Sequence, residues 1–201
     1  MTAPAWPLET DRLLLRPFAR GDLDALYAIH SNQEVARYLY NEPRTLEEVR
    51  ELLDLKIPGA EVRREGDTLN AAVVVRQTGG LVGDVSLHWA SETHSQGEIG
   101  FLVHPAWHGN GYATEAARPV LAFAFEKLGL HRVIGRTDAR NLGSARVLEK
   151  LGMRREAHLV ENEWVKNEWQ SELIYALLSR EWSGQSVQSD KDRDPRQQAE
   201  P

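Results

Sequence analysis

His108-Gly109-Asn110-Gly111-Tyr112-Ala113-Thr114-Glu115-Ala116 is the stretch that decides the fold of this chain. It follows a short apolar run, residues 99–103, and opens a long segment with apolar residues at helical spacing. A glycine-rich turn between a strand and a helix leaves backbone N–H groups without partners, and the positive end of the helix dipole lies behind them. Such donors form a pocket for phosphate. Glycine at 109 and 111 permits unusual backbone angles and leaves room for a ligand to approach.

Gly-x-Gly also occurs in ordinary turns, so the motif needs its context. The chain has no Gly-x-x-x-x-Gly-Lys-Ser/Thr, which disfavours a P-loop NTPase. A Rossmann fingerprint would place glycine or alanine where Thr114 stands and would lie in an early βαβ unit. Neither of these phosphate-binding classes therefore fits the turn.

A second motif runs from Asn141 to Met153. It begins with turn-forming residues and continues as a short amphipathic helix, whose apolar residues recur at helical spacing. Gly152 is a natural helix end. The two motifs follow one another along the chain, and their combination is more specific than either motif alone.

Together the two motifs resemble the acetyl-CoA signature of the GNAT superfamily of N-acetyltransferases. That signature is Gln/Arg-x-x-Gly-x-Gly/Ala, followed by Asn-x-x-Ser/Ala and a helix ending in Gly-Phe/Met. Residues 108–113 match the first part and residues 141–153 match the second. The flanks, residues 8–17 and 172–178, look like the branch that acetylates the N-termini of ribosomal proteins (RimJ/RimL-like). The resemblance covers nearly the whole chain apart from its tail.

The resemblance implies a mixed α/β fold, in which helices flank both faces of a central sheet of about seven strands. The sheet would splay between the fourth and fifth strands, here residues 98–104 and 132–137, and the cofactor would enter the gap. Local patterns add a capping box that begins at Thr45, a hairpin turn at residues 78–80, and a short helix capped by Asp22.

Length and composition fit a single globular domain. The chain has 201 residues, of which 41% are hydrophobic and 27% are charged. We expect this domain to span residues 1–182. Residues 183–201 are rich in Ser, Gln, Asp, Arg and Pro, a composition typical of a disordered tail.

Charge and residue usage exclude several classes of function. The net charge of −6 disfavours nucleic-acid binding and is compatible with cationic acceptors such as amines. Because the chain lacks cysteine, acyl transfer through a thiol intermediate is excluded. The seven histidines include no His-x-x-x-His pair, so no metal site is expected. Without an apolar run of membrane length or a visible secretory signal, a soluble cytoplasmic protein is the expectation.

By resemblance, the strand before the glycine turn pairs its backbone with the pantetheine arm of acetyl-CoA, and one of its amides supports the thioester oxygen. The pyrophosphate would rest on the amides that follow. His108 stands where the family usually has Gln or Arg, which removes an expected contact but leaves the backbone donors. The residues assigned to acetyl-CoA are Phe101, Leu102, Val103, His108, Gly109, Asn110, Gly111, Tyr112, Ala113, Thr114, Asn141 and Ser144.

Glu98 is the candidate general base, because it lies near the start of the cofactor strand, where many GNAT enzymes place a carboxylate. It would take a proton from the acceptor amine, directly or through a water. A solvated carboxylate at a strand edge is the simpler alternative. Glu161 and Glu163, in the loop region after the second motif, are the competing carboxylates.

Ser144 is the candidate donor to the departing thiolate. Many family members carry a tyrosine seven residues after the motif asparagine, where this chain has Leu148. The RimJ/RimL-like branch relies on the serine instead, whose hydroxyl can donate a hydrogen bond to sulfur. The structural alternatives are a helix-start serine for Ser144 and a turn residue for Asn141.

The sequence therefore predicts an N-acetyltransferase that moves an acetyl group from acetyl-CoA to a primary amine in a ternary complex. The branch resemblance favours the N-terminal α-amine of a protein or peptide. A small amine (an antibiotic, polyamine or amino acid) is the first alternative, and a non-catalytic CoA-binding module is the second. A homodimer formed through the C-terminal strands is compatible with the resemblance.

Overall fold

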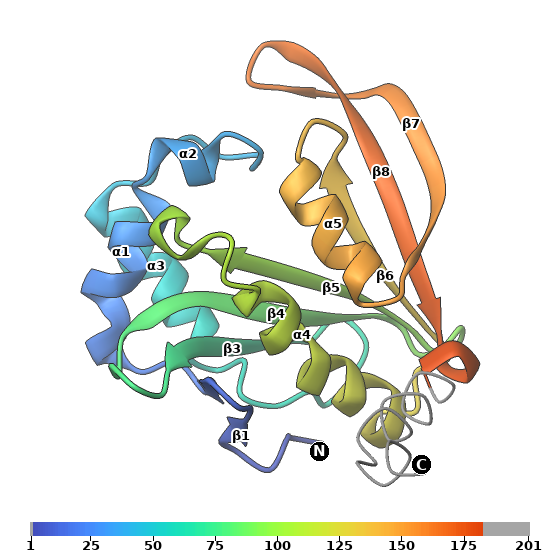
Figure 1. The fold of residues 1–201 in the computed structure, drawn as a ribbon, viewed down its shortest axis with the longest axis horizontal. Coiled ribbons are helices and arrows are strands. Elements are labelled where there is room, and N and C mark those ends of the chain that lie inside the picture. Colours follow the sequence, from blue (N-terminus) through green and yellow to red (C-terminus); the bar gives the residue numbers. More distant parts are fainter. Residues whose placement is uncertain (1, 183–201) are drawn as a thin grey trace, which may run out of the picture.

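One mixed sheet of eight strands organises residues 2–182, the part of the chain that the computed structural model describes. The strands are β1 (Leu8–Glu9), β2 (Leu13–Arg16), β3 (Thr68–Val75), β4 (Leu81–Ser91), β5 (Gln96–Val103), β6 (Arg132–Asp138), β7 (Arg154–Val165) and β8 (Glu168–Leu178). They lie in the order β1-β2-β3-β4-β5-β6-β8-β7 (Figure 1). The predicted disordered tail, residues 183–201, lies outside the described residues.

The sheet opens between β5 and β6, which form its one parallel pair within the described chain. This pairing covers three positions and ends at Glu98↔Ile134. Beyond Glu98 the two strands diverge, whereas β5 stays paired with β4 as far as Gly83↔Val103. The predicted splayed sheet is therefore confirmed. Its strand count rises to eight because the two-residue β1 pairs with β2 at the edge.

Helices cover both faces of the sheet. The helices α1 (Leu23–His30) and α3 (Leu46–Lys56) pack on one face, and α4 (Tyr112–Ala122) and α5 (Leu142–Lys150) pack on the other (Figure 1). The short α2 (Gln33–Ala36) follows α1, and a π-helical turn (Phe123–Lys127) extends α4. Among the helices of residues 2–182, none has the length and apolarity needed to cross a membrane.

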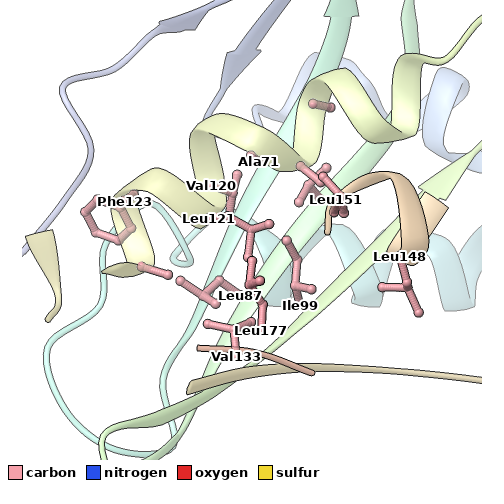
Figure 2. Close-up of a cluster of buried hydrophobic side chains, with 14 of the residues drawn as sticks. Ala71, Leu87, Ile99, Val120, Leu121, Phe123, Val133, Leu148, Leu151 and Leu177 are labelled. Carbon is pink, nitrogen blue, oxygen red and sulfur yellow. The ribbon is translucent and has the colours of Figure 1, made fainter. Parts of the chain in front are cut away.

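The larger core lies between the sheet and the α4–α5 layer. Figure 2 shows Leu121 of α4 directed toward Leu87 and Ile99 of the central strands. Leu148 of α5 and Leu151, the residue after α5, lie in the same cluster. All five side chains are at most 2% exposed. Each buried leucine or isoleucine of this kind contributes about 1.5–3 kcal/mol through the apolar area it removes from water. This core fixes α4 and α5, whose first turns border the splay, against the diverging strands.

Local patterns predicted the capping box at Thr45 and the turn at residues 78–80 correctly, but not the hydrogen bonds of Asp22. At Thr45 the hydroxyl accepts from the amide of Glu48, and the Glu48 carboxylate accepts from the amide of Thr45 at 2.7 Å. Residues 78–80 join β3 to β4, as expected. Asp22 is the N-cap residue of α1, as expected, but its carboxylate accepts from Arg16 at 2.7 Å and from the Ala19 amide at 2.8 Å and makes no capping hydrogen bond to that helix. The nearby guanidinium is the stronger partner for a carboxylate.

Candidate active site

A cavity of about 920 Å³ opens where β5 and β6 diverge. Its wall includes the end of β5, the glycine turn and the start of α5, together with parts of α1, β4, β6 and β8. Most of the predicted site residues lie on this wall, whereas Asn110, Thr114 and Glu161 are not part of it. The predicted residues that line the cavity are Glu98, Phe101, Leu102, Val103, His108, Gly109, Gly111, Tyr112, Ala113, Asn141, Ser144 and Glu163.

The glycine turn presents free backbone donors. Gly109 and Gly111 have φ values of 79° and 78°, in the left-handed region that favours glycine. The first amide of α4 with a partner is that of Glu115, which donates to Gly111 O at 3.0 Å. Within the described residues, none of the amides from 109 to 114 donates a hydrogen bond. Six such donors at the N-terminus of a helix are suited to a pyrophosphate.

Two side chains hold the turn in place. The side-chain Nδ2 atom of Asn110 donates to Trp107 O at 3.0 Å, so this side chain shapes the turn, and Asn110 is not part of the cavity wall. The Nε2 atom of His108 lies 2.8 Å from Val103 O and ties the turn to the end of β5. At the position where the family usually has Gln or Arg, the His108 ring therefore contacts the backbone of the protein itself.

The backbone of β5 divides its hydrogen-bonding groups between β4 and the gap. His104 N donates to Val82 O beside β4, and Ser95 O accepts from Arg132 N beside β6. Since peptide groups alternate in direction along a strand, those of Phe101 and Val103 face the gap. The carbonyl of Leu102 faces β4 instead, where a Cβ built on Gly83 would lie 2.1 Å from it. The predicted pairing with pantetheine thus fits Phe101 and Val103 better than Leu102.

The start of α5 holds Ser144 at the cavity. Asn141 is the N-cap residue, and its Oδ1 atom accepts from the Ser144 amide at 3.0 Å. The Ser144 hydroxyl lines the cavity and has no hydrogen-bond partner among residues 2–182. Leu148, at the position of the family's tyrosine, is 1% exposed and packs on Gly135 in the core. The remaining hydroxyl at the start of α5 is therefore the one available to a departing thiolate.

Glu98 is a carboxylate without an ion-pair partner among the described residues. Its neighbour across β4 is His88. Burial raises the pKa of Glu98, and the positive charge of Arg136 opposes this shift. Arg136 itself is held by two 2.8 Å hydrogen bonds to the buried Glu172 carboxylate. A carboxylate with a raised pKa is suited to general-base catalysis near neutral pH.

The two competing carboxylates lie in β7, not in a loop as the sequence suggested. A register shift between Leu159 and Glu163 interrupts the pairing of β7 with β8, and Glu161 lies in this bulge, exposed, with φ 49°. Glu163 resumes the pairing and faces the cavity, where it accepts from the Tyr40 hydroxyl at 2.5 Å. Burial and the Glu163 carboxylate raise the pKa of Tyr40 to about 12.

Arg12 is a residue near the glycine turn that the sequence did not indicate. Its guanidinium lies 4.9 Å from the Tyr112 ring centre and 3.7 Å from a Cβ built on Gly111. It also pairs with Glu115 in the first turn of α4, at 2.5 Å. Burial alone would raise the pKa of Glu115, but hydrogen bonds from Thr10 and Arg12 lower it. Arg12 therefore brings a cation to the turn and neutralises the carboxylate there.

Residues 2–182 contain no group of three or more His, Cys, Asp or Glu side chains placed to hold a metal ion. The functional candidates that sequence patterns missed are instead residues of the cavity wall brought together by the fold. They are His30, Tyr40, Arg44, Lys56, Asp84, Arg136 and Glu172.

Comparison with known proteins identifies the class to which this fold and site belong. An acetyltransferase (GNAT) domain model matches residues 12–154. The crystal structure of a GNAT-family acetyltransferase from Bacillus anthracis superposes with a TM-score of 0.78 at 32% identity, covering 87% of this chain and 99% of that one. The chain belongs to the GNAT acetyltransferase family, and the predicted enzyme class, an acetyl-CoA-dependent N-acetyltransferase, is confirmed.

The curated relatives differ in the acceptors that their names give. The uncharacterized N-acetyltransferase YnaD of Bacillus subtilis is 32% identical, over 88% of this chain and 99% of its own length. The putative ribosomal N-acetyltransferase YdaF of B. subtilis is 29% identical, over 78% and 85%. A spermidine N(1)-acetyltransferase of Vibrio cholerae is 27% identical, over 84% and 95%.

Proposed function

We propose that this enzyme acetylates the N-terminal α-amine of a protein or peptide, with Glu98 as general base and Ser144 as hydrogen-bond donor to the leaving sulfur. One observation carries the proposal. The Glu98 carboxylate on β5 and the Ser144 hydroxyl on α5, neither of which has a partner among residues 2–182, lie on the wall of one cavity where β5 and β6 diverge. The flanks of the sequence resemble the RimJ/RimL-like branch, and the name of YdaF agrees with an acceptor of this type.

The residues present fit acetyl-CoA. The free amides of residues 109–114 would hold its pyrophosphate, and the gap-facing peptide groups of Phe101 and the N–H of Val103 would hold its pantetheine arm, since the Val103 carbonyl contacts His108. When bound, acetyl-CoA supplies the acetyl group as an activated thioester. An N–H group of β5 directed into the gap would stabilise negative charge on the thioester oxygen.

Glu98 has a base strength that suits an α-amine. The α-amine has a pKa of about 7.7–8.0, whereas a lysine amine has one of about 10.4, so an α-amine needs less help to lose its proton. The Glu98 carboxylate, with its raised pKa, would take this proton directly or through a water. The Ser144 hydroxyl would then donate a hydrogen bond to the sulfur as the amide forms.

The direct test is CoA release from acetyl-CoA with a panel of acceptors that includes peptides beginning with Ser or Ala, spermidine and free amino acids. The proposal expects the peptides to give the highest kcat/KM. Ser144→Ala should lower kcat with these peptides roughly 10²-fold, because the leaving sulfur loses its donor, while CoA binding measured by calorimetry stays near that of the parent. Unchanged kcat in Ser144→Ala would contradict the assigned role.

A polyamine is the second candidate acceptor, because relatives at 25–27% identity are named spermidine N(1)-acetyltransferases. Faster turnover of spermidine than of every peptide would replace the proposed acceptor with this one. If CoA binds but no amine in the panel is acetylated, the chain is a CoA-binding module. The cytoplasmic location and a homodimer through the C-terminal strands stay predictions.

A further inference from the structure

A second group of charged side chains lies in the same cavity, away from the glycine turn. It consists of His30 at the end of α1, Arg44 just before α3, Lys56 at the end of α3, and Asp84 on β4. His30 and Asp84 are 8% and 6% exposed. Lys56 pairs with Asp84, since its Nζ atom lies 3.2 Å from Asp84 Oδ2. Arg44 makes no ion pair with these groups, although Glu34 of α2 also lines the cavity and the charge of Arg44 acts on Glu48 in the first turn of α3.

Arg44 is the cation that remains without a partner. Its backbone amide donates to His30 O at 2.9 Å, but its guanidinium makes no hydrogen bond or ion pair with residues 2–182. The Nε atom of Arg44 and both ring nitrogens of His30 are buried without partners. Leaving such groups unsatisfied is costly, so they are completed by water or by a ligand that enters the cavity. The other cations that line the cavity are ion-paired: Lys56 with Asp84, Arg136 with Glu163 and Glu172, and Arg140 with Asp138 and Glu168.

Glu98 and Arg44 are thus unpaired charges of opposite sign on the wall of one cavity. The register of the sheet gives the scale of their separation. Glu98 lies opposite His88, whereas Asp84, whose charge acts on His30 together with those of Lys56 and Arg44, lies four positions earlier on β4. At about 3.3 Å per residue, these positions are roughly 13 Å apart along the strand. An acceptor that meets both charges must carry its own two charges several bonds apart.

We propose that the acceptor is a peptide whose α-amine lies at Glu98 and whose acidic side chain, near the amino terminus, binds the Arg44 guanidinium. The inference rests on the proposed function, because it places the α-amine at Glu98. Guanidinium binds carboxylate through two parallel charge-assisted hydrogen bonds, the strongest pairing open to Arg44. A polyamine that reached Arg44 would place an ammonium group against this guanidinium.

The test compares peptides that differ only in charge, with Asp or Asn, and Glu or Gln, at the second or third position. The wild-type enzyme should prefer the acidic member of one pair by about tenfold or more in kcat/KM. Arg44→Gln should remove this preference through a higher KM for the acidic peptide, and leave the Asn or Gln peptide within about twofold of wild type. Arg44→Lys keeps the charge without the planar fork and should recover part of the preference. The matched control is Arg50→Gln, an exposed arginine on α3 paired with Glu47, which should behave as wild type.

Three outcomes would overturn the inference. They are the absence of any preference for acidic peptides, an equal loss on acidic and amide peptides in Arg44→Gln, and better turnover of spermidine or free glutamate than of any peptide. The proposed function fails separately, when no peptide α-amine is acetylated at all. Peptides acetylated without regard to acidic residues would leave the proposed function standing and refute the role of Arg44.

Discussion

Glu98, the proposed general base, makes no ion pair with the described residues. Burial raises the pKa of Glu98, and the charge of Arg136 limits that rise. A base works when it is deprotonated, so kcat/KM should rise with pH through the pKa of Glu98 and rise again as the acceptor amine loses its proton, at about pH 7.7–8.0.

Glu98→Gln should lower kcat/KM by roughly 10²-fold or more and remove the lower of these two pH limbs, leaving the limb of the amine. The measurement is a pH–rate profile with one peptide acceptor. The control is Glu92→Gln, an exposed glutamate in the turn after β4, outside the cavity. A profile that keeps its lower limb in Glu98→Gln would assign that limb to another group, and Glu163 would be tested next.

The ion pair between Arg12 and Glu115 leads to a second prediction, which concerns CoA binding. Its guanidinium neutralises Glu115 beside the free amides of the glycine turn. In Arg12→Gln the Glu115 carboxylate keeps its hydrogen bonds from the Thr10 hydroxyl and the backbone amide of residue 12 but loses its cation, and its charge at the N-terminus of α4 repels phosphate. We expect the Kd for CoA to rise about three- to tenfold, on the order of 1 kcal/mol for a partly exposed charge.

Calorimetry at two salt concentrations checks the Arg12 prediction, because a charge effect shrinks as salt screens it. The double variant Arg12→Gln/Glu115→Gln removes both charges and should recover most of the affinity. If Arg12→Gln binds CoA like wild type at low salt, the cation does not act on the cofactor site.

At the scale of elements, the position of α5 depends on close contact with β6. A Cβ placed on Gly135 would lie 2.5 Å from Leu148 Cδ2 and 3.3 Å from its Cδ1. Leu148 is 1% exposed, so it has little space into which to move. Glycine at 135 therefore lets α5 approach the sheet and carry Asn141 and Ser144 to the splay.

Gly135→Ala should destabilise the fold by about 1–3 kcal/mol, as overpacking of a filled core does. Urea unfolding with an unchanged m-value measures this loss. The matched control is Gly143→Ala within α5, where the new Cβ meets only Asn141 Oδ1 at 3.5 Å, an ordinary contact. That variant should be stabilised by about 0.5–1 kcal/mol, because glycine is unfavourable inside a helix. Equal stability of the two variants would show that α5 adjusts freely to the added methyl.

Sequence patterns predicted the features of this molecule that depend on residues close together in the chain. The capping box at Thr45 and the hairpin at residues 78–80 follow from local hydrogen bonds and backbone angles. The glycine turn follows in the same way, and the splayed sheet follows from resemblance. Asn141, expected as a turn residue, is the N-cap of α5 in the structure. β7 was taken partly as a loop, because its bulges break the alternation that marks a strand.

The long-range contacts around the cavity and the glycine turn were not predictable from local patterns. Tyr40 meets Glu163 across 123 residues, and Arg12 meets Glu115 across 103. Arg44 carries no local sign that its guanidinium lacks a partner, since that depends on how three helices and the sheet pack around it. Local patterns identify turns and caps, whereas the charge balance of a cavity emerges only from the complete fold.

The two halves of the sheet are joined across the cavity by contacts between the α2 region and the β7–β8 hairpin. The Lys166 ammonium, in the hairpin turn, donates to Ala36 O at the end of α2 at 2.6 Å, and Tyr40 donates to Glu163. Because β5 and β6 pair over only three positions, these contacts are among the few that hold the two halves at the acceptor end.

The double variant Tyr40→Phe/Lys166→Met should raise the KM for a peptide acceptor several-fold and leave the Kd for CoA unchanged, since the glycine turn lies elsewhere on the cavity wall. Amide hydrogen exchange should quicken in residues 33–45 and in the hairpin, while global stability falls by only about 1–2 kcal/mol. Tyr27→Phe, at an exposed tyrosine of α1, is the control for loss of a hydroxyl. Exchange that stays at the parental rate with an unchanged KM would mean that the hairpin is held by the sheet alone, and that the acceptor end needs no closure between the two halves.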